Sequence, residues 1–274
     1  IYTLSLHDAL PILSSLTTFA DSLMKTADLK QYRITGTINA NMSIIGIPIN
    51  ANIPMDFRLK LNADNTVQSA YINLDVPYFI GVLQQDMTAK VYYEDGVLYF
   101  DRNWETSTGA LWWKEYYDHH EYMKCTIDEF MANPMKYVYF CTNFTSMVEN
   151  AINDAIAKSD QKAVRTGNIM FEEALTGFHY NGSNQWNVNL DAAHLINNSD
   201  FSDQMSITVG KGSNGILNSI SLSTRVLDMI NLQLNNGQLV NADKSNVDMS
   251  VIPTGLSSNP NYVFGEVKVV ETKK

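Results

Sequence analysis

Apolar and polar residues alternate with a period of two over most of this chain. In Tyr32–Ile44 apolar side chains occupy nearly every second position, and Ile53–Leu61 and Val67–Val76 repeat the pattern. Such alternation is typical of a strand with one face on a core and the other in water. We therefore predict two sets of positions along the first two strands: buried at Ile34, Ile38, Met42, Phe57 and Leu59, and exposed at Arg33, Thr35, Asn39 and Lys60.

Two segments have a helical pattern instead. In Leu13–Leu29 the apolar residues recur every three or four positions, which predicts a helix whose apolar stripe faces the core. Thr126-x-x-Glu129 and Ser146-x-x-Glu149 match the capping box that starts helices. They predict a helical insert around residues 119–160, with a second long helix over 145–158. The stripe of the first helix contains Leu16, Phe19, Ala20, Leu23, Met24 and Ala27.

These elements predict an α+β fold. Asp95-Gly96 and Asn181-Gly182 are strong hairpin turns, the chain returns to strands between Phe178 and Leu234, and a last strand is expected at Tyr262–Val270. We expect a single curved, unclosed antiparallel β-barrel of about ten strands, with helices covering its concave face. Residues 13–274 are expected to form one domain.

Residues 1–12 have a different interpretation. They can be back-translated, codon for codon, into the adapter ligated to DNA fragments for short-read sequencing, and Leu13 supplies the T that follows. We expect this stretch to be an artefact of an assembled metagenome and to pack poorly. The natural N-terminus, with any signal peptide or lipid-attachment cysteine, is then expected to be missing.

Charge and hydropathy exclude several function classes. The formal net charge is −10, which disfavours binding to nucleic acid and direct adsorption to anionic lipid headgroups. No uninterrupted apolar run approaches the roughly 20 residues of a membrane-spanning helix. The charge pattern therefore points away from nucleic-acid partners.

The motifs that could carry chemistry are weak. Gly210–Gly215 has the spacing G-x-G-x-x-G, but a strand follows it where a dinucleotide site needs a helix, so we interpret it as a hairpin turn. Asp118-His119-His120-Glu121 resembles a metal cluster, yet adjacent side chains diverge, and we interpret it as a solvated loop. We expect no enzyme activity, no cofactor and no metal.

Cys125 and Cys141 are the two cysteines of the chain. They could be two buried reduced thiols, or one disulfide that closes a loop of about 15 residues and stabilises the fold by about 3 kcal/mol. The sequence leaves both alternatives open.

Aromatic residues are concentrated between Tyr78 and Tyr117. They could belong to an ordinary sheet core, because aromatic side chains favour strands. The functional interpretation is an apolar ligand cavity, since the inward-facing apolar positions of the strands outnumber those that the helices can cover.

The order of elements and the character of the strands resemble the bacterial lipoprotein-carrier superfamily of LolA, LolB and LppX type. The resemblance covers roughly residues 14–252 and implies an exported, often lipid-anchored half-barrel with a cavity for acyl chains. The insert around Cys125–Lys158 and the paired tryptophans have no counterpart in that family. The segments that carry the resemblance are YRITGTINANMSI, FRLKLNADNTVQSAYINLDV, KVYYEDGVLYFDR and ITVGKGSNGILNSISLSTRVLDMINLQLNNG.

We therefore predict an extracytoplasmic protein that binds an acyl chain or another apolar ligand between sheet and helices. It is expected to associate with the membrane only through an N-terminal lipid anchor. The alternative is a non-catalytic envelope sensor that binds another envelope protein through a filled cavity. Strand alternation gives the candidate lining residues: Met55, Phe57, Leu74, Phe79, Tyr92, Trp112, Ile207 and Leu232.

Overall fold

The structure is a computed structural model, and it describes most of the chain. The described ranges are 6–44, 47–80, 83–110, 112–133, 136–137, 140–141, 175–191, 204–226, 230–240 and 247–274. Some side chains at helix and strand ends, among them those of Met42, Phe79 and Leu232, lie outside the description. The predicted helix 145–158 also lies outside the described residues.

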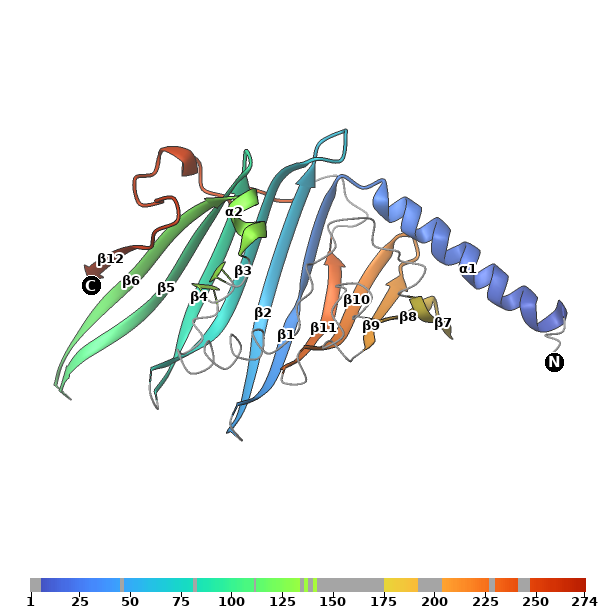
Figure 1. Cartoon of the computed structure of the whole chain (residues 1–274), viewed down its shortest axis with the longest axis horizontal. Helices are drawn as coiled ribbons and strands as arrows, with labels where there is room; N and C mark the ends of the chain where they lie inside the picture. Colours follow the sequence, from blue (N-terminus) through green and yellow to red (C-terminus); the bar gives the residue numbers. More distant parts are fainter. Residues whose placement is uncertain are drawn as a thin grey trace.

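The described part of the chain forms one antiparallel sheet of twelve strands (Figure 1), two more than the expected number. Their order across the sheet is β12-β6-β5-β4-β3-β2-β1-β11-β10-β9-β8-β7. β12 and β7 form the two edges, so the sheet is not closed into a barrel. The strands are β1 (Gln31–Ile44), β2 (Ile47–Leu61), β3 (Val67–Ile80), β4 (Leu83–Glu94), β5 (Val97–Ala110), β6 (Trp113–Thr126), β7 (Leu175–Gly182), β8 (Gln185–Asp191), β9 (Gln204–Lys211), β10 (Leu217–Val226), β11 (Ile230–Val240) and β12 (Lys268–Lys273).

The sheet consists of two meanders, β1–β6 and β7–β11, which meet where β1 pairs with β11. Within each meander, neighbours in sequence are neighbours in space, as short hairpin connections require. β12 returns the C-terminal segment to the far edge, beside β6.

Helix α1 (Leu6–Ala27) packs on the sheet through a face that the sequence analysis did not predict. Its buried residues are Ser15, Ser22 and Thr26. Leu16, Leu23 and Met24 of the predicted apolar stripe are 45, 49 and 60% exposed, so the predicted orientation was wrong.

Small hydroxyl side chains allow this orientation. Ser22 Oγ donates to the carbonyl of Thr18 at 2.9 Å, and Thr26 Oγ1 donates to the carbonyl of Ser22 at 2.6 Å. Because the hydroxyls find partners within the helix, they can be buried, and their small size lets the helix approach the sheet. Phe19 fills the interface against Phe178 and Trp186, with ring centroids 5.3 and 5.5 Å apart.

The predicted insert around 119–160 starts too early. Residues up to Thr126 continue strand β6, and the short helix α2 (Ile127–Ala132) follows. Its capping box is present as predicted: the Glu129 amide donates to the Thr126 hydroxyl, and the Thr126 amide donates to the Glu129 carboxylate.

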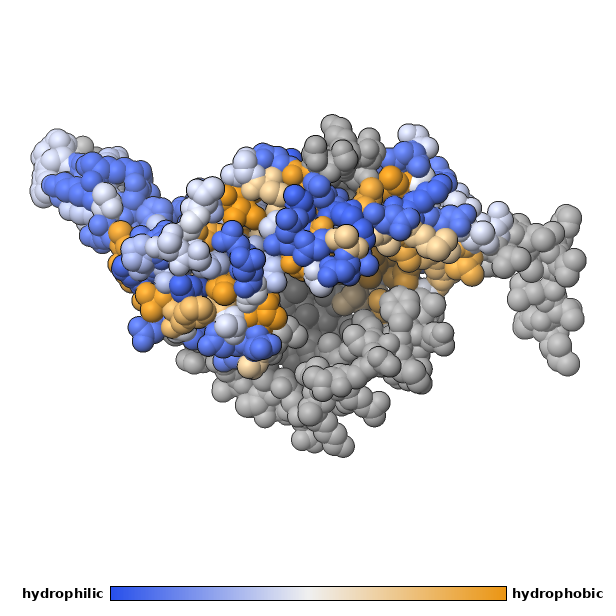
Figure 2. Space-filling view, turned by 90° about the horizontal axis from the view of Figure 1, so that it is seen from above, coloured by the Kyte–Doolittle hydropathy of each residue, from blue (hydrophilic) through white to orange (hydrophobic). Residues whose placement is uncertain are grey.

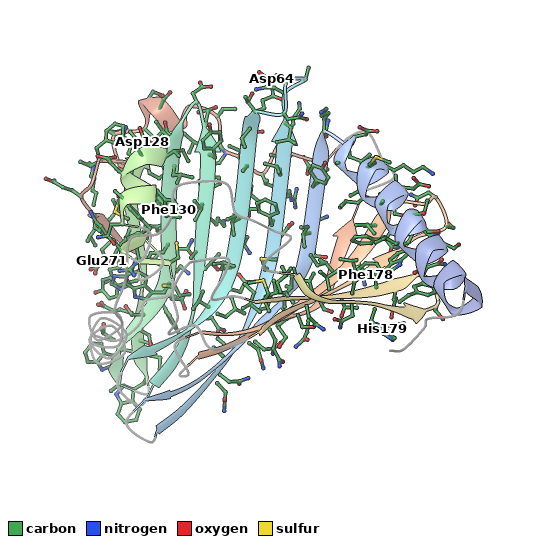
Figure 3. The ribbon with its side chains drawn as sticks, turned by 45° about the vertical axis from the view of Figure 1, so that its right-hand side comes forward. Asp64, Asp128, Phe130, Phe178, His179 and Glu271 are labelled. Atoms are coloured by element: carbon green, nitrogen blue, oxygen red, sulfur yellow. The ribbon has the colours of Figure 1, made fainter. Side chains whose placement is uncertain are left out.

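The two faces of the sheet carry different layers. We call the side with α1 and α2 the helix face; Figure 3 shows Phe130 of α2 and Phe178 of β7 on it. The opposite side is the loop face, because the segment 247–265 crosses it. Loop-face tyrosines Tyr71, Tyr92 and Tyr99 pack there with Leu256 and Tyr262.

The expected burial contrast on the first two strands is absent. Ile34, Ile38, Phe57 and Leu59 are half-buried rather than buried. Their expected exposed counterparts Arg33, Thr35, Asn39 and Lys60 are also half-buried, and Met42 lies outside the described side chains. Both described helices pack elsewhere, since α1 contacts β10 and α2 contacts β6.

Candidate functional site

An apolar row crosses the middle of the helix face. Directly paired residues on antiparallel strands place their side chains on the same face. The ladder pairs Ile207 with Leu222, Leu222 with Leu234, Leu234 with Ile38, and Ile38 with Ile53. The row therefore spans strands β9, β10, β11, β1 and β2 with apolar side chains only.

This row connects two buried clusters. One cluster contains Trp186, Val209 and Leu217 and packs beside Phe19 of α1. The other contains Ile53 together with Val76, Met87, Ala89, Phe100, Met123, Cys125, Tyr137, Phe140 and Cys141. Between them, the first four members of the row remain only half-buried: Ile207, Leu222, Leu234 and Ile38.

The cluster near α2 is held by aromatic and cationic contacts. Phe100 stacks on Tyr137 at 5.2 Å between centroids and meets Phe140 edge-on at 6.2 Å. Arg102 Nη1 donates to the carbonyl of Phe140 at 2.7 Å, and its guanidinium lies 4.4 Å from the Phe140 ring. Glu121 pairs with Arg102 from the neighbouring strand. These contacts fix Tyr137 and Phe140 against β5 and β6.

The structure brings together only part of the predicted ligand-binding set. Met55 pairs with Leu74 on the helix face, in the same alternation as Phe57, and Ile207 lies on this face in the second meander. All four are half-buried. Phe79 and Leu232 belong to β3 and β11, but their side chains lie outside the described part.

Two predicted residues lie elsewhere. Tyr92 is 3% exposed, but it packs on the loop face with Tyr71 at 5.7 Å. Trp112 is 85% exposed in the turn between β5 and β6 and lines no apolar cluster. The structure therefore does not bring these two residues together with the rest of the predicted set, because a local pattern does not reveal which face of a strand meets which layer. The sequence pattern also does not reveal that β1 pairs with β11. For this reason Ile207 is the one residue of the apolar row among the predicted lining residues.

His119 and His120 are strand residues, not parts of a solvated loop. They occupy β6 and point to opposite faces, as their adjacency requires. On the helix face, His119 stacks on Trp104 at 5.3 Å. Its Nε2 lies 2.6 Å from Thr106 Oγ1, and its Nδ1 lies 3.2 Å from Glu271 Oε2. A hydroxyl, an imidazole and a carboxylate therefore lie in one chain across β5, β6 and β12.

On the loop face, His120 lies beside a buried carboxylate. Its Nδ1 is 3.7 Å from Asp101 Oδ1, and neither atom has a hydrogen-bond partner within the described ranges. Burial raises the pKa of Asp101, although His120 and Lys90 partly offset this effect. Burial also raises the pKa of Tyr92 and Tyr262 nearby. The environment thus disfavours added negative charge.

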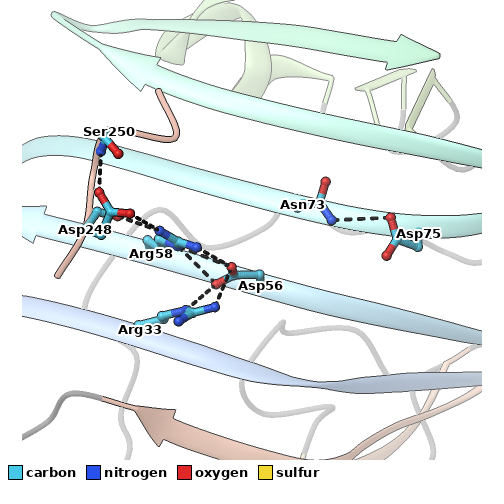
Figure 4. Close-up of polar contacts among 7 residues, drawn as sticks. All are labelled: Arg33, Asp56, Arg58, Asn73, Asp75, Asp248 and Ser250. Carbon is cyan, nitrogen blue, oxygen red and sulfur yellow. Dashed lines mark hydrogen bonds and ion pairs between the residues drawn. The ribbon is translucent and has the colours of Figure 1, made fainter. Parts of the chain in front are cut away.

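A charged network fastens the segment 247–250 to the loop face (Figure 4). Asp56 accepts hydrogen bonds from Arg33 at 2.9 and 3.0 Å and from Arg58 at 2.8 Å. Arg58 is 8% exposed and also donates to the carbonyl of Asp248 at 2.6 Å. Burial raises the pKa of Asp56, but the hydrogen bonds from Arg58 and Arg33 outweigh it, so the pKa lies below its usual range. The network is structural because its charges are mutually paired.

Cys125 and Cys141 are buried free thiols within one apolar cluster. Burial raises the pKa of both, that of Cys141 to about 12. Neither sulfur is therefore an activated nucleophile at neutral pH.

Within the described ranges, no three His, Cys, Asp or Glu side chains are placed to hold a metal ion. None of the described helices combines the length and apolar character needed to cross a membrane.

Comparison of the chain with protein-family models gives no match, and comparison with curated proteins finds no similar sequence.

Proposed function

We propose that this protein binds an acyl chain or another elongated apolar ligand along the helix face. The observation that carries the proposal is the half-buried row Ile207, Leu222, Leu234 and Ile38. Single apolar residues that remain partly exposed are common on proteins, but a continuous strip of them is typical of an interaction site. The strip continues across four neighbouring strands, β9, β10, β11 and β1, which suits an elongated ligand better than a compact one.

The energetics support such a ligand. Each methylene removed from water contributes about 0.8 kcal/mol, before the entropy lost on binding is subtracted. The strip ends at two packed aromatic clusters, which would limit the length of the ligand. An acyl chain is also the ligand expected from the resemblance to the lipoprotein carriers, and an exported location would follow from that relationship.

Two neighbouring residues of β9 provide a matched test. Ile207 belongs to the strip, whereas the next residue, Thr208, pairs with Ser221 on the loop face. We expect Ile207→Asn to weaken binding of a dansyl-labelled fatty acid about tenfold or more, because a polar amide replaces an apolar contact. Thr208→Asn should bind like the wild type. Both variants are first checked for an unchanged circular dichroism spectrum.

Native mass spectrometry of the purified protein, followed by lipid extraction, tests the wild type directly. Absence of a co-purifying apolar molecule together with no fatty-acid binding at micromolar concentration would contradict the proposal.

A second candidate, ester hydrolysis, is favoured by the chain of Thr106, His119 and Glu271. These groups have the order of a hydroxyl nucleophile, a general base and a carboxylate that orients the base. The test is hydrolysis of p-nitrophenyl esters by the wild type and by Thr106→Ala. A rate that is equal in both proteins would exclude this role for Thr106.

A further inference from the structure

The two ends of the sheet have opposite character. Because the strands are antiparallel, successive turns lie at alternate ends. One end carries the turns Asn62–Thr66, Asp95–Gly96, Ser183–Asn184 and Gly212–Ile216. Asn65, Asp95 and Asn184 adopt positive φ there, as polar hairpin turns commonly do. Figure 2 looks down on this end, where hydrophilic residues predominate.

The opposite end is mostly apolar at the strand ends that the structure describes. Four of the five last ladder pairs there are Ile44–Ile47, Ile80–Leu83, Ala110–Trp113 and Val226–Ile230, and all eight of their residues are apolar. The fifth pair, between β8 and β9, is polar: Asp191–Gln204. The four apolar pairs belong to different hairpins and lie along one end of the sheet, at the bottom of Figure 1.

Among these hairpins, side chains are described at the end of β5–β6, and they are exposed to solvent. Trp112 is 85% exposed and Trp113 is 60% exposed, and Tyr116 follows at 42%. Trp112 lies in the turn between β5 and β6, a position where Asn or Gly is usually preferred. A tryptophan that is poorly suited to a turn and exposed to solvent is explained if the surroundings of this turn are not water.

Local charges would permit approach to lipid in spite of the net charge of −10. The acidic residues nearest this hairpin end are paired with the C-terminal lysines: Glu115 with Lys273 at 2.5 Å, and Asp118 and Glu105 with Lys274. Lys114, next to Trp113, is exposed. The acidic residues Glu105, Glu115 and Asp118 beside the β5–β6 hairpin are therefore neutralised by lysines, although the chain as a whole is acidic.

We propose that this apolar end docks into the interfacial region of a zwitterionic lipid bilayer. Tryptophan and tyrosine are the residues enriched at that depth, because their rings combine an apolar body with a polar group. The proposal goes beyond the proposed ligand site and does not depend on it.

Intrinsic fluorescence offers a direct test with phosphatidylcholine vesicles. The chain has four tryptophans; Trp186 is fully buried and Trp104 is stacked on His119, so Trp112 and Trp113 should report on the lipid. We expect the emission of the wild type to shift to shorter wavelength on adding vesicles, and brominated lipid to quench it. An unchanged spectrum at millimolar lipid, with no co-sedimentation, would overturn the proposal.

Variants test whether vesicle binding depends on the apolar end or on exposed aromatic rings elsewhere in the protein. Replacing Trp112 and Trp113 by Ala should lower the vesicle partition coefficient about tenfold or more. Ile47→Asp and Leu83→Asp, in two other hairpins, should lower it as well. Phe264→Ala is the control, because Phe264 is 50% exposed but adjoins Lys124 near the polar end.

The failure of this proposal is distinguishable from failure of the ligand site. The tryptophan variant should retain fatty-acid binding, and Ile207→Asn should retain vesicle binding. A different outcome is that the wild type forms a dimer, the tryptophan variant does not, and vesicles bind neither protein. The apolar end would then contact a second copy of the chain, and the membrane proposal would be wrong.

Discussion

The hydroxyl oxygen of Thr26 accepts a hydrogen bond from the backbone amide of Leu217 at 2.9 Å. The two residues are 191 positions apart in the chain, and both are buried. The contact joins the end of α1 to the start of β10 and satisfies an amide that would otherwise have no partner in the core. Helix α1 is thus attached through a side chain that sequence periodicity would assign to solvent.

Replacing Thr26 by Val should destabilise the protein by about 1–3 kcal/mol, because the buried Leu217 amide loses its acceptor while the side-chain volume is conserved. Urea denaturation followed by circular dichroism measures the change in the free energy of unfolding. Thr26→Ser is the control, since it keeps the hydroxyl. Equal stability of Thr26→Val and the wild type would show that the contact does not stabilise the helix.

Arg58 and Arg33 both bind Asp56 but differ in burial. The side chain of Arg58 is 10% exposed and that of Arg33 is 32% exposed. We expect Arg58→Met to cost about 2–3 kcal/mol and Arg33→Met to cost about 1 kcal/mol or less.

Hydrogen exchange provides a local measurement of the same change. The amide of Val247, which donates to Gln31 Oε1 at 2.6 Å, should exchange faster in Arg58→Met because segment 247–250 loses its attachment to Arg58. Similar protection of this amide in both arginine variants would contradict the assignment.

Asp56 should stabilise the fold only while it is ionised. Its pKa in the folded protein lies below the ordinary value of 3.8. The stabilisation is therefore present above that value and is lost as the pH falls through the lower pKa of the folded state. The stability difference between wild type and Asp56→Asn should shrink in acid, as measured by urea denaturation at a series of pH values. A constant difference across the series would exclude this linkage.

Asp101 should show the opposite dependence. Burial holds its pKa above the ordinary value of 3.8 in the folded protein. The folded state then binds the proton more tightly than the unfolded state, so stability falls as the pH rises from 3.8 through the raised pKa. Asp101→Asn should become more stable relative to the wild type over this interval. A decrease in the relative stability of Asp101→Asn over this interval would instead show that His120 and Lys90 stabilise the ionised form of Asp101 in the folded protein.

Cys125 and Cys141 should react slowly with Ellman's reagent in the native protein at pH 8. Both thiols are buried, and the raised pKa of Cys141, about 12, keeps it protonated. Two thiols should react at once in denaturant without reductant. Detection of no free thiol under those conditions would demonstrate a disulfide.

Much of the sheet could be predicted because strand alternation and turn residues are local signals. The hairpin at Asp95-Gly96 and the capping box at Thr126 were both found in this way. The layer that covers each face could not be predicted, because it depends on contacts between distant segments. Tyr92 shows this limit: its alternation predicts burial correctly, but the side chain packs under Tyr262 rather than toward a helix.

Helix α1 shows a second limit. Hydropathy assigns Leu23 and Met24 to the core and Ser22 to solvent, yet the structure buries Ser22 and exposes the other two. Hydropathy does not account for hydroxyls that bond to their own helix and therefore carry little cost on burial. The apolar ends of the hairpins were also missed, since their alignment follows from strand register.

The junction of the two meanders has a consequence for biosynthesis. β1 leaves the ribosome before the other described strands, and β2 to β6 can pair in turn as they emerge. The partner for the other edge of β1 is β11, which ends at Val240. Until then, β1 presents an unpaired edge able to pair with other nascent chains, and non-local pairing of this kind is slow. The protein should therefore depend on chaperones during synthesis more than its many local hairpins would suggest.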